Sequence, residues 1–301
     1  MSGVELRRMT RQERAGLTFT LPVLLLTLAV VVVPTVGALV LSVTDFDIYA
    51  LGDLANLRFV GLSNYADLAA GPRFWRAAVN TLLFAVLGVP AAIATSLGAA
   101  LLIASATVRW KPLWRVLLFA PYVTTLVATA VVWRYLLDTR TGLVNYALSS
   151  IGVAPIDWLG DPRTSIPAIV IFVVWKIFGY NMIVFTAALG LVPADLYEAA
   201  RLDGAGAWLR FRHVTLPAIG PALLLAAVLS VANFLQIFTE PYVMTHGGPA
   251  QSTVTVLYFM FDQGFEWWSL GSASAVAVVL FVAVLAVTAV QARLGRKFEW
   301  L

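Results

Sequence analysis

The chain has 301 residues, a length that would suit one or two soluble domains. Its composition argues against a soluble protein, because 60% of the residues are hydrophobic and 12% are charged, where soluble domains have about 45–50% and about 25%. The chain has no Cys and only two His, which excludes a disulfide framework and a thiolate metal site, and its net charge of +4 is better explained by orientation in a membrane than by a nucleic-acid partner.

Six apolar stretches are each long enough to cross a bilayer as a helix. About 20 apolar residues span the hydrocarbon core, and a helix satisfies its own backbone hydrogen bonds there. The sequence therefore predicts an all-α, polytopic membrane protein with six transmembrane helices. The six spans cover residues 17–43, 77–106, 113–137, 166–192, 216–238 and 270–291.

Basic residues predict how the spans are oriented. The first span follows four arginines, and it is longer than the ~7–15-residue apolar core of a signal peptide, so we expect it to be retained. The segments on the same side as the termini hold twelve Lys and Arg residues, against five on the other side. Because basic loops stay in the cytoplasm, we predict an inner-membrane protein with both termini cytoplasmic. Its parts are a cytoplasmic segment (1–16), a transmembrane domain (17–292) and a cytoplasmic tail (293–301).

Polar side chains within the third and fourth spans are candidates for a substrate path. A polar group in a span costs free energy unless it meets a partner or lines a water-filled space. Packing between helices is the alternative use of each, and for glycine it is the commoner use. In the fourth span the candidates are Gly179, Tyr180 and Asn181. In the third span the secondary candidates, beside Pro121, are Tyr122, Thr124 and Thr125.

Lys176 lies deep in the fourth span and needs a partner or a cavity. Glu240, at the outer end of the fifth span, is one candidate partner. An ion pair with another subunit is the other interpretation.

The loop between the fourth and fifth spans, residues 193–215, has the signals of a short helix. Pro193 and Asp195 suit a helix start, since the first turn tolerates proline and favours a negative charge. Small and apolar residues follow at helical spacing, and Gly204 and Gly206 end the helix. We call this segment the inner loop. A helix lying at the membrane surface is the general alternative for such a segment.

The fifth span carries the remaining candidates for a substrate path. Ser230, Asn233 and Gln236 recur at every third residue, and Phe234 lies among them. Amide and hydroxyl groups beside an aromatic ring suit a ligand with many hydroxyl groups, and hydrogen bonding between helices is the alternative. Ser230 can also bond back to its own helix.

The chain lacks the residues of an enzyme. No Gly-x-x-x-x-Gly-Lys-Ser/Thr sequence is present, so a phosphate-binding loop is absent. No nucleophile–base pair or metal cluster can be identified, and we predict no catalytic residue, no metal ligand and no cofactor bound by this chain.

The inner loop resembles the EAA loop of permease subunits from bacterial ABC importers. The resemblance rests on Glu198-Ala-Ala with Gly204, on Asp203-Gly204-Ala205, and on Phe211, Leu216-Pro217 and Pro221. In that family the loop forms a coupling helix that fits a cleft on the ATP-hydrolysing subunit. The resemblance implies that the contact residues are Leu196, Glu198, Ala199, Ala200, Asp203, Gly204, Ala205 and Gly206.

Further segments resemble permeases for carbohydrates, in the order that family shows. They are Phe59-Val-Gly-Leu-Ser-Asn-Tyr65, Asn80-Thr81, Pro121-Tyr122, Trp133, Gly142-Leu-Val-Asn145, Trp158-Leu159 and Thr245-His-Gly-Gly-Pro249. The resemblance implies a type I ABC importer fold and a disaccharide substrate, trehalose first and maltose or a related glycoside second. It also implies the partners: a second homologous permease in a heterodimer, two ATP-binding subunits that hold ATP and Mg, and an extracytoplasmic sugar-binding protein.

The sequence thus predicts the permease subunit of an ATP-driven sugar importer. The alternative is a secondary sugar carrier coupled to an ion gradient. Such carriers use inverted repeats, interrupted helices and buried carboxylates, and no Asp or Glu lies at the centre of any predicted span.

Overall fold

The computed structural model describes residues 11–105 and 107–297, and this part of the chain is built of helices with two isolated β-bridges. The all-α prediction is therefore confirmed. Most of the predicted cytoplasmic segment, and the end of the predicted tail, lie outside the described residues. The last helix continues to Lys297, six residues beyond the expected end of the sixth span.

Four helical stretches are long and apolar enough to cross a membrane. The first is Thr18–Leu41, which runs through α1 (Arg11–Thr27), the π-helical turn η1 (Leu28–Val32) and α2 (Val33–Leu41). The others are α5 (Pro72–Ala104), α9 (Pro162–Gly190) and α16 (Leu270–Lys297).

The third and fifth predicted spans are bent, not straight. The third consists of α6 (Lys111–Val123) and α7 (Leu126–Leu136), which meet at 97°. The fifth consists of residues Ala207–Ala218 and α13 (Gly220–Leu235), which meet at 72°. Counting each bent pair as one span gives the six that the sequence predicts. Proline lies close to both bends, at Pro121 and Pro221, and its missing N–H and its ring weaken the helix there.

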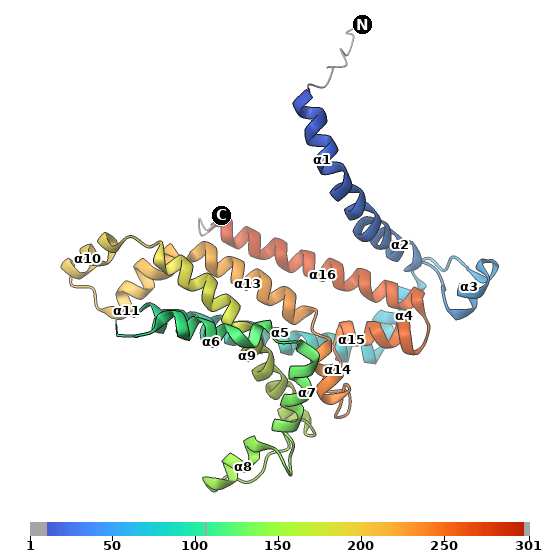
Figure 1. Cartoon of the computed structure of the whole chain (residues 1–301). Coiled ribbons are helices and arrows are strands. Elements are labelled where there is room, and N and C mark those ends of the chain that lie inside the picture. Colours follow the sequence, from blue (N-terminus) through green and yellow to red (C-terminus); the bar gives the residue numbers. More distant parts are fainter. Residues whose placement is uncertain (1–10, 106, 298–301) are drawn as a thin grey trace.

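The first span is almost uncovered within this chain. Its window of highest hydropathy has no buried residue, and α1 extends away from the other helices (Figure 1). Only α2, at its far end, lies against α16. An exposed apolar helix of this length requires lipid or another subunit around it.

The core of the bundle lies between α5, α9 and α13. Fully buried side chains from these helices, including Phe84, Phe172 and Phe234, form one continuous apolar cluster. α9 is the most enclosed of the spans, with 61% of its central window buried. It is therefore the central helix, against which the cavity described below is built.

Close approach of α5 and α13 depends on Gly88. A Cβ built on Gly88 would lie 2.1 Å from the Phe234 ring, which has no exposed surface. We expect Gly88→Ala to lower the free energy of unfolding by about 1–3 kcal/mol, because an overpacked core must shift. Gly98→Ala in the same helix is the matched control, since nothing lies within 4 Å of its Cβ. Thermal unfolding of the purified protein in detergent measures both, and equal melting temperatures for the two variants would contradict this packing.

Three asparagines hold loops outside the spans by bonding to backbone. Asn64 donates to the carbonyl oxygens of Ser42 and Thr44 at 2.9 and 2.8 Å. Asn80 donates to Gln251 and Val254 O, both at 2.9 Å. Asn64 and Asn80 therefore fix the backbone of the loops that they contact.

The third asparagine, Asn145, organises the loop between the third and fourth spans. Its side chain donates to Ile156 O at 2.8 Å and accepts from Ile156 N and Trp158 Nε1, both at 3.1 Å.

The short elements outside the spans on this side of the bundle are α3 (Ile48–Gly52), η2 (Leu54–Asn56), α4 (Ser63–Ala70), α8 (Leu143–Ser150), α14 (Thr239–Thr245), α15 (Val256–Phe261) and η4 (Asp262–Glu266).

Candidate functional site

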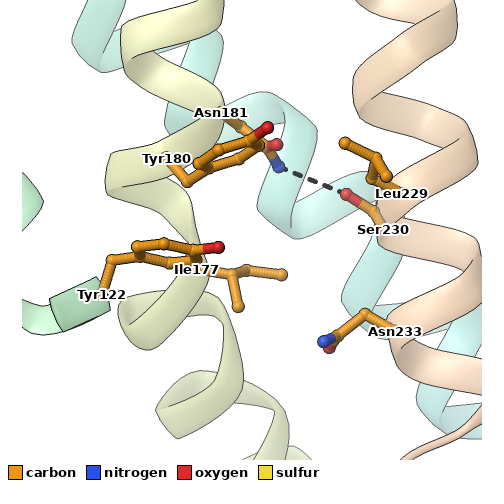
Figure 2. A pocket seen from close by; sticks show the side chains of 7 residues that line it. All are labelled: Tyr122, Ile177, Tyr180, Asn181, Leu229, Ser230 and Asn233. Carbon is orange, nitrogen blue, oxygen red and sulfur yellow. Dashed lines mark hydrogen bonds between the residues drawn. The ribbon is translucent and has the colours of Figure 1, made fainter. Parts of the chain in front are cut away.

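A cavity of about 230 Å³ lies between α6, α9 and α13. We call it the central cavity. It combines aromatic, amide, hydroxyl and aliphatic side chains, as Figure 2 shows. Its lining residues are Tyr122, Ile177, Tyr180, Asn181, Leu229, Ser230 and Asn233.

Two tyrosine rings form one wall of the central cavity. Tyr122 from α6 and Tyr180 from α9 stack with their ring centroids 5.1 Å apart and an interplanar angle of 26°. Both hydroxyl groups point toward α13 (Figure 2). The rings therefore present polar edges to the cavity and join two helices at the same time.

The other polar side chains of the lining form one hydrogen-bonded pair and one unpartnered amide. Asn181 Nδ2 donates to Ser230 Oγ at 3.2 Å, and both residues are buried, so this bond ties α9 to α13. Asn233, one turn along α13 from Ser230, makes no hydrogen bond within the described part of the chain, and its amide points into the space between the helices (Figure 2). An amide offers two donors and an acceptor, which suits a neutral ligand with many hydroxyl groups.

Four of the seven residues expected on a substrate path line this cavity: Tyr180, Asn181, Ser230 and Asn233. The structure places the other three elsewhere. Phe234 is fully buried against Gly88 on the far side of α13. Gly179 packs on α6, where a Cβ would lie 2.3 Å from Leu118 O. Gln236 is exposed at the C-terminal cap of α13 and does not line the cavity.

The structure adds Tyr122, Ile177 and Leu229 to the lining. Tyr122 was available to sequence reasoning as a secondary candidate beside Pro121. Ile177 and Leu229 carry no signal that distinguishes them from the many aliphatic residues of the spans.

Lys176 does not pair with Glu240, so that expectation is wrong. The Lys176 ammonium instead bonds to four oxygens at the break between α6 and α7. The side chain is 7% exposed, and the partners lie within the same chain. An intersubunit ion pair is therefore not needed to explain a buried lysine in this span.

Two carboxyl groups outside the six spans are buried. Glu240 in α14 is 7% exposed and Asp262 in η4 is 6% exposed. Burial raises the pKa of Glu240, and burial together with the charge of Glu266 raises the pKa of Asp262 to about 6. Neither lines the central cavity. Among the described residues, no group of three or more His, Cys, Asp or Glu side chains could hold a metal ion.

The inner loop contains the predicted helix. α10 (Ala194–Leu202) begins after Pro193, carries Asp195 in its first turn and ends at Asp203. Gly204 has a φ of +77°, Ala205 N donates to Ala200 O at 2.9 Å, and Gly204 N donates to Arg201 O at 3.0 Å. This is a Schellman C-cap, in which a left-handed glycine lets the last carbonyls of the helix be satisfied.

α10 presents most of its surface to solvent. Leu202 is 90% exposed and Leu196 is 48% exposed, while Glu198, Ala199 and Asp203 are also exposed. Tyr197 instead faces the bundle, and its hydroxyl lies 3.0 Å from Thr215 Oγ1. The helix is thus anchored on one side and offers apolar and acidic side chains on the other, at one end of the bundle (Figure 1).

The inner loop leads directly into the wall of the central cavity. After α10 the chain passes through α11 (Ala207–Arg210), the π-helical η3 (Phe211–Thr215) and α12 (Leu216–Ala218), and then enters α13. α13 carries Leu229, Ser230 and Asn233 of the cavity.

The described helices form a bundle with two bent spans, a cavity between α6, α9 and α13, and an exposed helix α10, and this fold is that of a type I ABC importer permease. The description "Binding-protein-dependent transport system inner membrane component" belongs to a family whose sequence profile matches residues 15–300. The chain belongs to this family.

Curated relatives are similar over almost their whole length. The chain is 32% identical over 287 residues to the trehalose/maltose transport system permease protein MalF of Thermococcus litoralis, covering 95% of each chain. It is 34% identical over 277 residues to the lactose transport system permease protein LacF of Rhizobium radiobacter, covering 90% of this chain and 91% of the relative.

A solved structure has the same fold. A chain from the crystal structure of a bacterial ABC transporter involved in the import of the acidic polysaccharide alginate superposes with a TM-score of 0.82. The match covers 95% of this chain and 96% of that chain, at 22% sequence identity. At this identity the match shows a shared fold.

Proposed function

We propose that this chain is the permease subunit of an ATP-driven importer for a sugar, and that the central cavity is part of the sugar's path. The observation that carries the proposal is the direct connection from the exposed, glycine-capped α10 to the cavity-lining α13. One chain thereby holds both an exposed helix for an ATP-hydrolysing partner and a cavity between the spans that contains amide and hydroxyl groups. The names of the relatives, which include permeases for trehalose/maltose and lactose, support a carbohydrate substrate.

ATP hydrolysis belongs to partner subunits in this proposal. The chain has no phosphate-binding loop, and its inner loop resembles an EAA loop. Two ATP-binding subunits, which hold ATP and Mg, would each contact a coupling helix, here through Leu196, Glu198 and Asp203 on the exposed side of α10. A partner shifts a conformational equilibrium only through its different affinity for the two states, so the contacts of α10 must change between inward-facing and outward-facing forms.

A second, homologous permease and an extracytoplasmic sugar-binding protein complete the proposed complex. The uncovered first span supports a partner within the membrane. A solved alginate transporter of the same fold was crystallised with an alginate-bound periplasmic protein. The termini of this chain are proposed to be cytoplasmic, on the distribution of basic residues.

Trehalose, or a related disaccharide such as maltose, is the proposed sugar. The proposal rests on the overall resemblance to the first permease of trehalose importers, and the Thermococcus relative named for trehalose and maltose supports it. The cavity residues fit a neutral glycoside, since no charged side chain is among them.

Sugar uptake in membrane vesicles that contain the whole complex tests the energy source. We expect uptake to require ATP and to be abolished by vanadate, while a protonophore leaves it unchanged when ATP is supplied. The rival ion-coupled carrier predicts the reverse pattern. Uptake that persists without ATP and collapses with the protonophore would contradict the proposed function.

A further inference from the structure

The break between α6 and α7 is held by a lysine from a third helix. We call the two extended residues at this break, Thr124 and Thr125, the elbow. α9 lies against α6, and Lys176 from the middle of α9 reaches the elbow. The Lys176 side chain is almost fully buried, whereas Thr124 and Thr125 are exposed, so the interaction lies at the edge of the bundle.

The Lys176 ammonium lies in a cage of oxygen atoms. Nζ donates to Pro121 O at 2.6 Å, to Thr124 Oγ1 at 2.8 Å and to Thr124 O. Tyr122 O lies 3.4 Å away and completes the set. Three N–H groups are thus shared among four oxygens, of which three are backbone carbonyls.

The Lys176 ammonium compensates for helical hydrogen bonds that are lost at the bend. The last carbonyls of α6 lose their i+4 N–H partners where the helix ends, and they carry the negative end of the helix dipole. Pro121 O also accepts from Thr124 N and Thr124 Oγ1, and Lys176 adds a charged donor. A cation from a neighbouring helix both satisfies them and complements the dipole, so Lys176 stabilises the bent conformation relative to a straight helix.

The elbow and the central cavity share Tyr122. Its carbonyl belongs to the oxygen cage, and its ring forms a wall of the cavity by stacking on Tyr180. Lys176 and Tyr180 are one helical turn apart on α9, and Gly179 between them allows α9 to touch the backbone of α6 at Leu118. Two residues of α9 therefore position Tyr122: Lys176 bonds to the Tyr122 carbonyl oxygen, and Tyr180 stacks on the Tyr122 ring.

We propose that Lys176 is a positioning residue for the central cavity: its ammonium fills an oxygen cage at the elbow and thereby places the Tyr122 ring against the sugar. This inference rests on the proposed sugar-transport function. Lys176 is not among the residues that line the cavity. The four oxygens of this cage are also the kind of ligand that binds a monovalent cation, and the Lys176 ammonium occupies that position.

The test uses the assembled transporter in vesicles and three substitutions. Lys176→Met keeps an unbranched apolar stem without a donor, and we expect it to raise the half-saturating sugar concentration about tenfold, on the scale of a lost charged hydrogen bond. Lys176→Arg keeps a cationic donor and is expected to recover part of the affinity. Lys176→Ala leaves room for the missing atoms, so n-propylammonium is expected to restore uptake in this variant and not in Lys176→Met.

The results separate this inference from the proposed function. Wild-type vesicles without ATP-dependent uptake would overturn the proposed function. Active wild-type vesicles with an unchanged half-saturating concentration in Lys176→Met would overturn the inference alone, as would assembled Lys176→Ala complex that n-propylammonium does not rescue. If the lysine variants fail to assemble, Tyr122→Ala provides the second measurement. An unchanged half-saturating sugar concentration in Tyr122→Ala would show that the Tyr122 ring does not contribute to sugar affinity, and would overturn the inference.

Discussion

Sugar uptake by a complex that carries Gly204→Val is expected to fall at least tenfold, with the subunits still assembled in the membrane. Gly204 has a φ of +77° at the C-cap of α10, and a β-branched residue in the left-handed region costs about 1–3 kcal/mol. The strain would remove the Schellman hydrogen bonds from Ala205 to Ala200 and from Gly204 to Arg201. The end of α10 would then leave the conformation in which it meets the ATP-binding subunit.

Gly204→Asn is the matched control for this prediction. Asparagine adopts the left-handed conformation much more readily than valine, and it is uncharged. We expect this variant to keep most of the uptake. ATP hydrolysis and uptake are measured together in the same vesicles, because loss of coupling lowers uptake per ATP hydrolysed. Equal uptake in Gly204→Val and the wild type would show that the C-cap of α10 is not needed to couple ATP hydrolysis to sugar transport.

The second large effect is expected at the central cavity. Asn233→Ala removes the unpartnered amide that points into the cavity, and Tyr180→Ala removes the ring that stacks on Tyr122. A hydrogen bond contributes about 0.5–1.5 kcal/mol, so we expect Asn233→Ala to raise the half-saturating sugar concentration by about 2–12-fold. Tyr180→Ala is expected to act at least as strongly, because it removes both a sugar-facing ring and the support of Tyr122.

Gln236→Ala controls for the loss of an amide from the same region. Gln236 is exposed at the end of α13, one turn beyond Asn233, and it lies outside the cavity. We expect its half-saturating concentration to match the wild type. Uptake of radiolabelled trehalose over a range of concentrations provides the comparison. Loss of affinity in Gln236→Ala with none in Asn233→Ala would place the sugar path elsewhere.

The helices and the inner loop were predictable from sequence because their signals are local. A run of about 20 apolar residues defines a span wherever it occurs. Pro193, Asp195 and Gly204 mark the start and end of α10 through backbone geometry alone. The bends in the third and fifth spans were not predicted, because hydropathy measures the length of an apolar run and not its direction. Pro121 and Pro221 hint at a bend, but prolines also occur within continuous spans, such as Pro90 in α5.

The lining of the cavity was only partly predictable because it depends on which helices meet. Sequence spacing placed Ser230 and Asn233 on one face of α13, and both line the cavity. Phe234 is adjacent to Asn233 in sequence, yet it faces α5 because Gly88 leaves room for its ring. The partner of Lys176 could not be found from sequence either, since backbone carbonyls exposed by a bend carry no residue signature.

The central claim is that α10 contacts an ATP-binding subunit. Cross-linking from the exposed surface of α10 tests this claim most directly. The chain has no cysteine, so a single Leu202→Cys places one thiol on a side chain that is 90% exposed. Leu143→Cys, in the exposed helix α8 at the other end of the bundle, is the control. In the purified complex, a short thiol-to-amine cross-linker is expected to join Cys at position 202, and not at position 143, to the ATP-binding subunit. No cross-link from position 202 in an assembled, transport-active complex would contradict the account.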